Sequence, residues 1–257
     1  MKINFLSKVR SRYYWMGGIL LCTVILFTSI SSRKSGIIQD VRITIKPLQG
    51  GELLVQDKDI INTITSNYGS TLDGLAIREI DVQKIEDFAK MNPFVKKAEV
   101  FIDARSRLCV NITQNNPLLR IFDKYGHSYY IDEDLKTFPV SRHDSPRMLI
   151  ANGYLPAQDQ VLSNADSMII HDVVKIADEI SKDEFAQRNT EQIYVEEDGN
   201  IVLATKLGNQ KFLIGDASRI EEKLYYIQIY YKNIASTAGW KKYKFVNLKF
   251  DGQIVCN

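Results

Sequence analysis

The side chains best suited to acid–base chemistry are three histidines, two of which stand beside an aspartate. His143 precedes Asp144 and His171 precedes Asp172, while His127 lies in a predicted turn. A catalytic triad needs a carboxylate that orients the imidazole through space, and two adjacent residues do not give that geometry. No serine stands in a Gly-x-Ser-x-Gly motif and no histidine in a His-Glu-x-x-His motif. The sequence therefore offers no catalytic candidate and predicts a protein that is not an enzyme.

Three further patterns could hold an ion or a phosphate group. Asp132-Glu133-Asp134 offers carboxylates, but it lacks the alternating ligands of a calcium loop and is typical of a turn. Gly50-Gly51 has no lysine after it, so it does not form a phosphate-binding loop. The three cysteines, Cys22, Cys109 and Cys256, are too far apart for a metal site, and a Cys109–Cys256 disulfide stays open. We predict no cofactor, no metal and no small-molecule substrate.

An uncharged segment near the start predicts a membrane anchor. From Tyr13 to Ser32 the chain carries no charged side chain. A helix of this length, rising about 1.5 Å per residue, spans about 30 Å, the thickness of the hydrocarbon core of a bilayer. We therefore predict one transmembrane helix over residues 13–32. The alternative is a signal peptide cleaved near Ser29-Ile30-Ser31.

The charges that flank this segment predict its orientation. Basic residues and no acidic ones precede it, namely Lys2, Lys8, Arg10 and Arg12, whereas only Arg33 and Lys34 follow it closely. Such a bias places the N-terminus in the cytoplasm. We expect a short cytoplasmic tail over residues 1–12, a linker over 33–40 and an extracytoplasmic region beyond. The formal net charge of +2 gives no reason to expect a nucleic-acid partner.

The residues after the linker predict a compact α+β unit. Residues 41–45 alternate between apolar and polar side chains, as in a half-buried strand. Helices are expected over residues 57–69 and 81–92, the second capped by an aspartate and stopped before a proline. Strands at 100–103 and 108–112 are close enough to form a hairpin. This order buries two helices on one face of a small sheet.

The rest of the chain predicts a mostly antiparallel sheet with two helices. The expected strands cover residues 119–123, 129–131, 138–140, 148–150, 192–196, 201–206, 211–214, 243–250 and 253–256. One helix is expected over residues 163–180, with Met168 among its inward side chains. The other is expected to open with a capping box made by Ser218 and Glu221.

Four segments, in order along nearly the whole chain, resemble motifs of the bacterial FtsQ/DivIB family. They are residues 92–100 (NPFVKKAEV), 108–118 (LCVNITQNNPL), 130–134 (YIDED) and 246–255 (VNLKFDGQIV). The sequence departs from the family pattern at Gln114-Asn115-Asn116, where a charged pair is usual. It also keeps only part of the family's motif over residues 147–153.

The resemblance implies a POTRA (polypeptide-transport-associated) domain over residues 41–116 and a β domain over residues 117–257. It also implies a non-catalytic scaffold at the division septum, which links early and late division proteins by binding the small coiled-coil proteins FtsB and FtsL. In this family the terminal strand of the β domain is the main docking edge for FtsB. The matching positions here are Phe245, Val246, Leu248, Phe250, Asp251 and Gly252, and Tyr226 and Tyr230 of the preceding helix are expected on the same side.

Side-chain alternation along this last strand predicts which positions face the core. We expect Val246, Leu248 and Phe250 to point inward, leaving the backbone for the partner. Two other functions stay open at this stage. One is a POTRA-bearing export or assembly factor of the cell envelope, and the other is a membrane-anchored envelope hydrolase.

Overall fold

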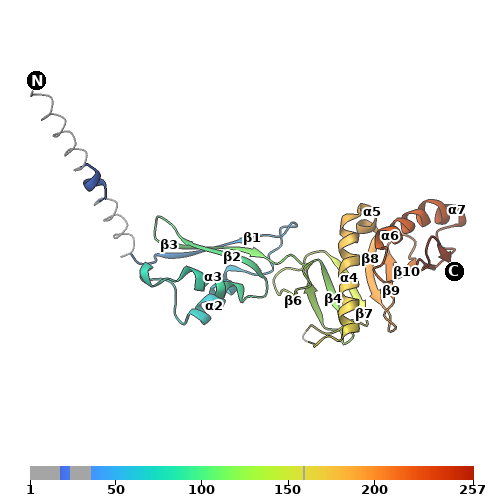
Figure 1. Ribbon diagram of the computed structural model, residues 1–257, viewed down its shortest axis with the longest axis horizontal. Helices are drawn as coiled ribbons and strands as arrows, with labels where there is room; N and C mark the ends of the chain where they lie inside the picture. The colour runs from blue at the N-terminus through green and yellow to red at the C-terminus, as the bar shows by residue number, and fades with distance from the viewer. Residues whose placement is uncertain (1–17, 24–35, 159) are drawn as a thin grey trace, which may run out of the picture. The chain divides into compact units, whose positions relative to one another are not determined.

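The computed structural model describes residues 18–23, 36–158 and 160–257 (Figure 1). The chain splits into two compact units. Unit 1 contains the first strand and residues Val55–Thr113, and unit 2 contains Pro47–Leu54 and Gln114–Asn257. Residues 47–54 thus group with the second unit, although we expected them in the first. The reason is visible in two hydrogen bonds, from Leu53 N to Asp144 Oδ2 at 2.7 Å and from Leu54 N to Gln114 Oε1 at 2.6 Å.

Residues 18–23 of the expected transmembrane segment are helical and exposed. The remainder of that segment, the whole cytoplasmic tail and residues 33–35 of the linker lie outside the described residues. Across the part of the chain that is described, no helix has the length and apolar character that a membrane crossing requires.

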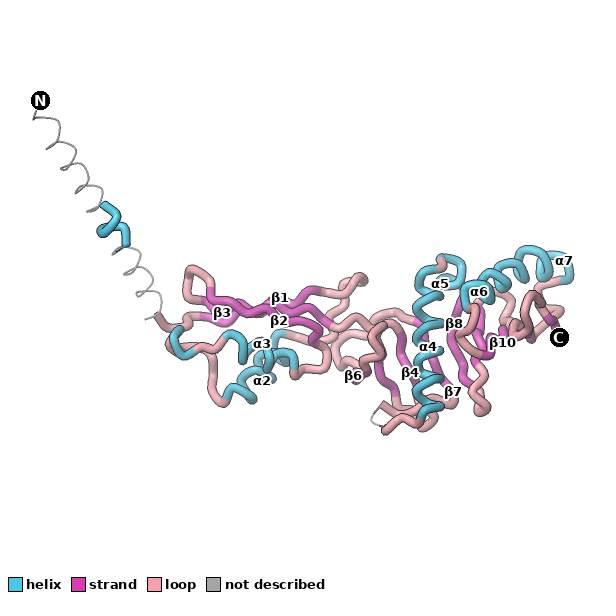
Figure 2. The backbone as a smooth tube through the Cα atoms, viewed as in Figure 1, coloured by secondary structure: helices cyan, strands magenta, loops and turns pink. Residues whose placement is uncertain are grey.

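Unit 1 is a three-stranded sheet with helices on one face (Figures 1 and 2). Its strands are β1 (Asp40–Lys46), β2 (Val95–Ile102) and β3 (Arg107–Gln114), in the order β1-β3-β2. Strand β1 runs parallel to β3, with Ile43 beside Val110. The helices are α2 (Asp57–Tyr68) and α3 (Val82–Lys90), with a short 3-10 turn, η1 (Ile77–Glu79), between them.

The ends of these helices follow from their sequence. Helix α2 ends at Gly69, whose φ of 83° is left-handed and whose N–H donates to Thr65 O, as the glycine signal predicts. Helix α3 begins after Asp81, whose carboxylate accepts the N–H of Lys84. Strand β2 starts at Val95, earlier than expected. Its first residues were not predicted as a strand because the exposed Lys96 and Lys97 interrupt the alternation of apolar and polar side chains.

The core of unit 1 lies between the helices and one face of the sheet. The helices contribute Ile60, Ile64, Ile85 and Ala89, and the strands contribute Ala98, Val100, Leu108, Val110 and Ile112. The predicted strand–helix–helix–strand–strand unit is confirmed.

Unit 2 is built on a nine-stranded sheet whose strand order is β12-β11-β10-β9-β8-β7-β4-β5-β6. The strands are β4 (Leu119–Phe122), β5 (Ser128–Ile131), β6 (Thr137–Pro139), β7 (Leu149–Gly153), β8 (Thr190–Val195), β9 (Ile201–Thr205), β10 (Lys211–Gly215), β11 (Phe245–Asn247) and β12 (Val255–Cys256). Three of the pairings are parallel, β4 with β7, β7 with β8 and β10 with β11. The other described pairings are antiparallel, in agreement with the mostly antiparallel sheet that was expected.

Helices cover one face of this sheet (Figure 1). They are α4 (Asn164–Lys182), α5 (Glu184–Asn189), α6 (Ile220–Ile229), the π-helical segment η2 (Tyr230–Ala235) and α7 (Ser236–Ala238). Buried residues of α4 and α6, such as Val173 and Leu224, share one core with the strand residues Leu119, Ile193 and Phe212. The alternate strand residues face the other side of the sheet.

Two local expectations in unit 2 are wrong. Ser218 and Glu221 do not form a capping box, because the Ser218 N–H and hydroxyl both donate to Asp216 and the cap of α6 is Arg219. Met168 does not face the core but is largely exposed, and the α4 residue at this end that does turn inward is Ile170, whereas Val173 is buried as expected.

Candidate functional site: the C-terminal edge of unit 2

The expected docking strand over residues 243–250 is shorter in the structure. Strand β11 covers only Phe245–Asn247 and lies between two neighbours, β10 on one side and β12 on the other. The chain leaves the sheet after Asn247, whose side chain accepts the N–H of Lys249, and reverses at Gly252, where φ is 64°. Strand β11 therefore has no open edge, and β12 is the outermost strand at this end of the sheet.

The backbone of β12 presents hydrogen-bonding groups outward. Phe245 and Asn257 exchange N–H···O bonds in both directions, at 3.4 and 3.0 Å. In an antiparallel pair such residues alternate with residues whose backbone groups point away from the neighbouring strand. Cys256 faces Val246 at one of these alternate positions. Its N–H and C=O therefore face the open side of the sheet.

Alternation predicts two of the three inward side chains correctly and fails at the third. Val246 and Leu248 are buried, as expected, and Leu248 N donates to Leu213 O. Phe250 was expected in the core but is 53% exposed. The physical reason is that the strand ends at Asn247, so the alternation that applies to a strand does not reach Phe250.

The remaining expected docking residues fall into an exposed and a buried set. Phe245 and Asp251 are exposed, whereas Tyr226 is partly buried and donates its hydroxyl hydrogen to Glu222. Tyr230 is buried against the Phe212 ring, at 5.3 Å between centroids, so it belongs to the core and not to the surface. Sequence reasoning missed Val255, which is 37% exposed on the outermost strand. We call the set Phe245, Phe250, Asp251, Gly252, Val255 and Cys256 the C-terminal edge surface.

Side-chain contacts tether the turn between β11 and β12. The Arg219 guanidinium forms an ion pair with Asp251 and a second one with Glu222 at 3.3 Å. The Lys249 ammonium donates to Asn200 Oδ1 at 2.8 Å. A Cβ atom on Gly215 would stand only 2.9 Å from Lys249 Cγ, so the lysine stem lies directly over this glycine. These contacts fix the turn to the β8–β9 connection and to the start of α6.

A buried lysine fixes the loop that supports Arg219. The Lys223 side chain is only 4% exposed, and its ammonium donates to Asp216 O and Asp216 Oδ1, both at 3.0 Å, and to Ser218 Oγ at 3.4 Å. The hydrogen bond from Ser218, together with Lys223, lowers the pKa of the Asp216 carboxyl to about 2. The charge of Lys223 is thereby compensated, and Arg219 adopts its left-handed conformation, with φ 50°, at the start of α6.

The sheet face opposite the helices carries a groove that extends from β7 to Phe245 of β11. Its volume is about 360 Å³, and it is lined by Asn152, Gln192, Tyr194, Glu196, Val202, Ala204, Lys211 and Phe245. The Lys211 ammonium stands 5.8 Å from the centre of the Phe245 ring. The lining is mixed, with the aromatic residues Tyr194 and Phe245, the apolar residues Val202 and Ala204, and polar and charged residues.

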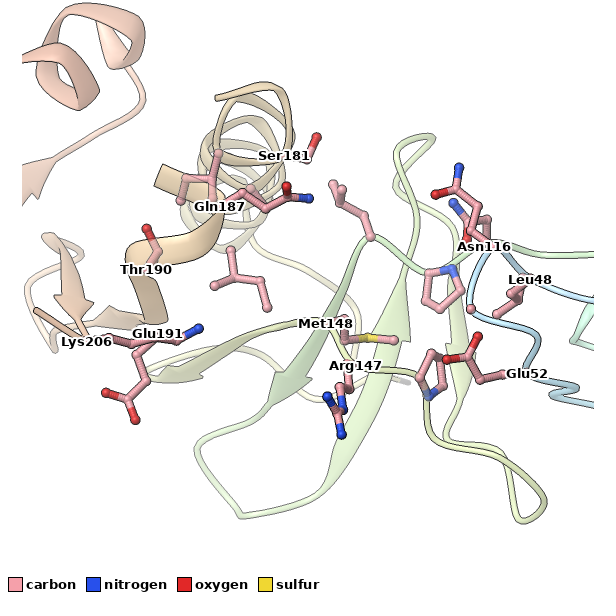
Figure 3. Close-up of a pocket in the computed structure, with 18 residues that line it drawn as sticks. Leu48, Glu52, Asn116, Arg147, Met148, Ser181, Gln187, Thr190, Glu191 and Lys206 are labelled. Atoms are coloured by element: carbon pink, nitrogen blue, oxygen red, sulfur yellow. The ribbon is translucent and has the colours of Figure 1, made fainter. Parts of the chain in front are cut away.

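A larger pocket of about 640 Å³ lies elsewhere in unit 2 (Figure 3). Its charged lining residues are Glu52, Arg147, Glu191 and Lys206, and neither a histidine nor a cysteine lines it. Figure 3 shows Glu191 beside Lys206 and Glu52 at the opposite side of the pocket.

The histidines lie at the surface, and the acidic cluster forms a turn. The His127 ring is 81% exposed in the β4–β5 turn, with Nδ1 3.5 Å from Asp123 Oδ2. His143 lies in an exposed loop and His171 on the exposed side of α4. Asp132 is buried and accepts the N–H groups of Asp134 and Lys136, which makes the acidic cluster part of the β5–β6 turn.

No metal centre or disulfide is formed by the described residues. None of their acidic, histidine and cysteine side chains gather into a group of three or more that could hold a metal ion. Cys22, Cys109 and Cys256 are free thiols, and the last two belong to different units.

Comparison with known proteins agrees with the two units. A family model for POTRA-like domains matches residues 37–113. A second model, described as FtsQ/DivIB, C-terminal related, matches residues 116–257, which is more than half of the chain. No curated protein matches the chain. The FtsQ/DivIB family consists of membrane-anchored division proteins that generally act as non-catalytic scaffolds. The chain belongs to the FtsQ/DivIB family of bacterial division proteins.

Proposed function

We propose that this protein is a single-pass membrane scaffold of the bacterial divisome that binds FtsB, together with FtsL, through the C-terminal edge surface. Family membership supports the division role. Two observations carry the binding site: β12 is the outermost described strand at this end of the sheet, and the Phe250 ring in the turn before it is exposed.

A strand edge of this kind binds an extended segment through main-chain hydrogen bonds. Strand β12 has only two residues, and of these Cys256 turns its backbone groups outward. So short an edge cannot supply the affinity alone. The side chains around it must therefore contribute, and Phe250 and Val255 are the exposed apolar ones.

Some of the expected docking residues would touch the partner, and the others would hold the docking strand in place. Phe245, Phe250, Asp251 and Gly252 are at the surface and would touch the partner. Val246, Leu248 and Tyr230 are buried, so they would act by holding β11 in the sheet. Tyr226 would act through Glu222, which also pairs with Arg219 and so supports the turn at Asp251.

The proposed topology places residues 1–12 in the cytoplasm, residues 13–32 in the inner membrane, and the POTRA domain (41–116) and the β domain (117–257) outside the cytoplasm. It rests on the uncharged segment and on the excess of basic residues before it. This arrangement gives the scaffold access to the extracytoplasmic parts of FtsB and FtsL at the septum.

A binding titration with matched variants tests the docking site. The purified full chain is titrated into a labelled extracytoplasmic segment of FtsB, and binding is followed by fluorescence anisotropy. We expect Phe250→Glu to weaken binding at least about tenfold, because it replaces the exposed aromatic ring of this surface with a charge. Phe101→Glu is the control, since Phe101 is 47% exposed on β2 of unit 1.

Binding by the Phe101→Glu variant should equal that of the original protein. Equal affinity of the Phe250→Glu variant would exclude the C-terminal edge surface as the FtsB site. Membrane insertion should be the same in both variants.

A further inference from the structure

The sheet of unit 1 has two edges, and only one of them is blocked. At the β2 edge, the N–H of Val100 donates to Glu86 Oε1 at 2.9 Å, so a side chain already occupies part of this edge. At the other edge, β1 pairs only with β3, and no other described strand lies beside it. A seven-residue edge strand that no other described strand covers is unusual, because such strands pair readily with other chains.

The hydrogen bonds just before β1 show which of its backbone groups face outward. Gln39 N donates to Ser106 O, toward β3. Its neighbour Ile38 turns the other way, donating to Leu75 O and accepting from Gly74 N. Since backbone groups alternate along a strand, the N–H and C=O groups of Asp40, Arg42 and Thr44 point to the open side.

The side chains along this edge are only partly covered. Val41, Ile43 and Ile45 pack against the core of unit 1 but are not buried, in contrast to Leu108, Val110 and Ile112 of β3. A strand added beside β1 would bury the rest of these three apolar side chains. The opposite face of β1 carries the charged residues Asp40, Arg42 and Lys46.

We propose that a second copy of this chain occupies the edge, so that two β1 strands pair antiparallel about a twofold axis at Ile43. In this register Asp40 faces Lys46 of the second copy, and Val41 faces its Ile45. Arg42 faces Thr44, and this pair exchanges backbone hydrogen bonds because both residues turn their N–H and C=O outward. The sequence of β1 is complementary to itself in charge and in apolar character.

Charge also selects this register over its neighbours. Shifting the second strand by two residues in one direction places Arg42 against Arg42. Shifting it in the other direction places Arg42 against Lys46. Like charges directly opposite each other destabilise a strand pair, whereas the register centred on Ile43 pairs Asp40 with Lys46. A strand from a different protein would need a charge and apolar pattern that matches β1. The β1 strand of a second copy already has such a pattern.

Disulfide trapping tests the register in the full chain. The native thiols are first removed by Cys22→Ser, Cys109→Ala and Cys256→Ala, and single cysteines are then placed along β1. Ile43→Cys should cross-link with a mild oxidant, because residues at this non-hydrogen-bonded position lie about 4.5 Å apart between Cα atoms. Arg42→Cys and Thr44→Cys should not cross-link, since each would be more than about 7 Å from its copy.

Cross-linking at position 42 or 44 but not at 43 would overturn the proposed register. A cross-link from position 43 to a different protein in membranes would overturn the second copy as the occupant. The absence of any cross-link at position 43 would reject the edge as an interface between copies.

Exchanging the charges of Asp40 and Lys46 tests the dimer without cross-linking, and both residues are exposed, so the fold should be retained. The dimer dissociation constant of the detergent-solubilised full chain is measured by analytical ultracentrifugation. Asp40→Lys and Lys46→Asp should each weaken dimerisation about fivefold, because each places like charges opposite one another. The double variant should return within about twofold of the original value.

Equal weakening in the double variant, or no effect in the single ones, would contradict the proposal. Binding of FtsB at the C-terminal edge surface should be the same in all of these variants. Failure of the dimer and failure of the proposed FtsB site are thereby distinguishable.

Discussion

The two units expose their sheets in different ways. Unit 1 leaves a seven-residue strand open at β1. Unit 2, with three times as many strands, ends in the two-residue strand β12 and, at the other edge, in β6, whose last residue is Pro139. A long open edge offers backbone hydrogen bonds, whereas a short edge must recruit side chains such as Phe250. The two sheets therefore offer different groups at their edges.

The units also differ in the size of their cores. Each has its own cluster of buried apolar residues, and that of unit 2 is much the larger. A small core buries a smaller fraction of the surface of its chain and is correspondingly less stable. Single substitutions can therefore separate the two units experimentally.

The largest effect is expected from a core truncation in unit 1. Ile64 is fully buried on α2, so Ile64→Ala should destabilise unit 1 by about 2–5 kcal/mol. Hydrogen exchange should rise over residues 55–113 and remain unchanged in the strands of unit 2. Increased exchange throughout both units would show that they do not fold independently.

A smaller effect is expected from removing the partner of the buried lysine in unit 2. Asp216→Ala leaves the Lys223 ammonium without its carboxylate and should cost about 1–2 kcal/mol, discounted because Asp216 is 63% exposed. Lys223→Met, which removes the buried charge itself, should cost less. Urea unfolding followed by the fluorescence of Trp240, which stacks on Tyr231, measures both in a Trp15→Phe background.

The same pair predicts a dependence on pH. The folded pKa of Asp216 is about 2, below its ordinary value of 3.8, so its ionised form stabilises the fold above pH 3.8. This contribution should disappear as the pH falls from about 4 to 2. The Asp216→Ala variant should lose less stability over this interval, and an equal loss would contradict the assigned pKa.

The smallest effect concerns two equivalent turns. Gly126 and Leu135 both stand three residues after a turn aspartate and both have a positive φ, 87° and 63°. Leucine is strained there, so Leu135→Gly should stabilise unit 2 by up to about 1 kcal/mol. Gly126→Ala should destabilise it by about the same amount. The two changes in urea midpoint should be of opposite sign, and a shared sign would contradict this account.

Most of the fold could be predicted from local patterns. The caps at Asp81 and Gly69 act within a few residues, and the alternation in β1 reports directly on one buried face. The hairpin of β2 and β3 follows in the same way from the short connection between these strands. These features depend on neighbours in the sequence, so the sequence alone is sufficient to predict them.

The candidate site was harder to predict because it depends on long-range contacts. Nothing local shows that β12 covers β11, or that the strand ends before Phe250. The cap of α6 was missed for a local reason, because Ser218 donates to Asp216, two positions before it, and so does not cap the helix. The open edge of β1 likewise becomes visible only when the order of the strands in the sheet is known.

Complementation in cells depleted of this protein tests the central claim, that it is a division scaffold acting through the C-terminal edge surface. Tagged copies of the original protein and of the Phe250→Glu and Phe101→Glu variants are expressed in depleted cells, which are scored for length and for mid-cell signal. We predict filaments on depletion, and rescue by the original protein and by Phe101→Glu. Phe250→Glu should reach the membrane without restoring division. Normal division after depletion, with a uniform envelope signal, would contradict the division role, and full rescue by Phe250→Glu would contradict the assigned surface.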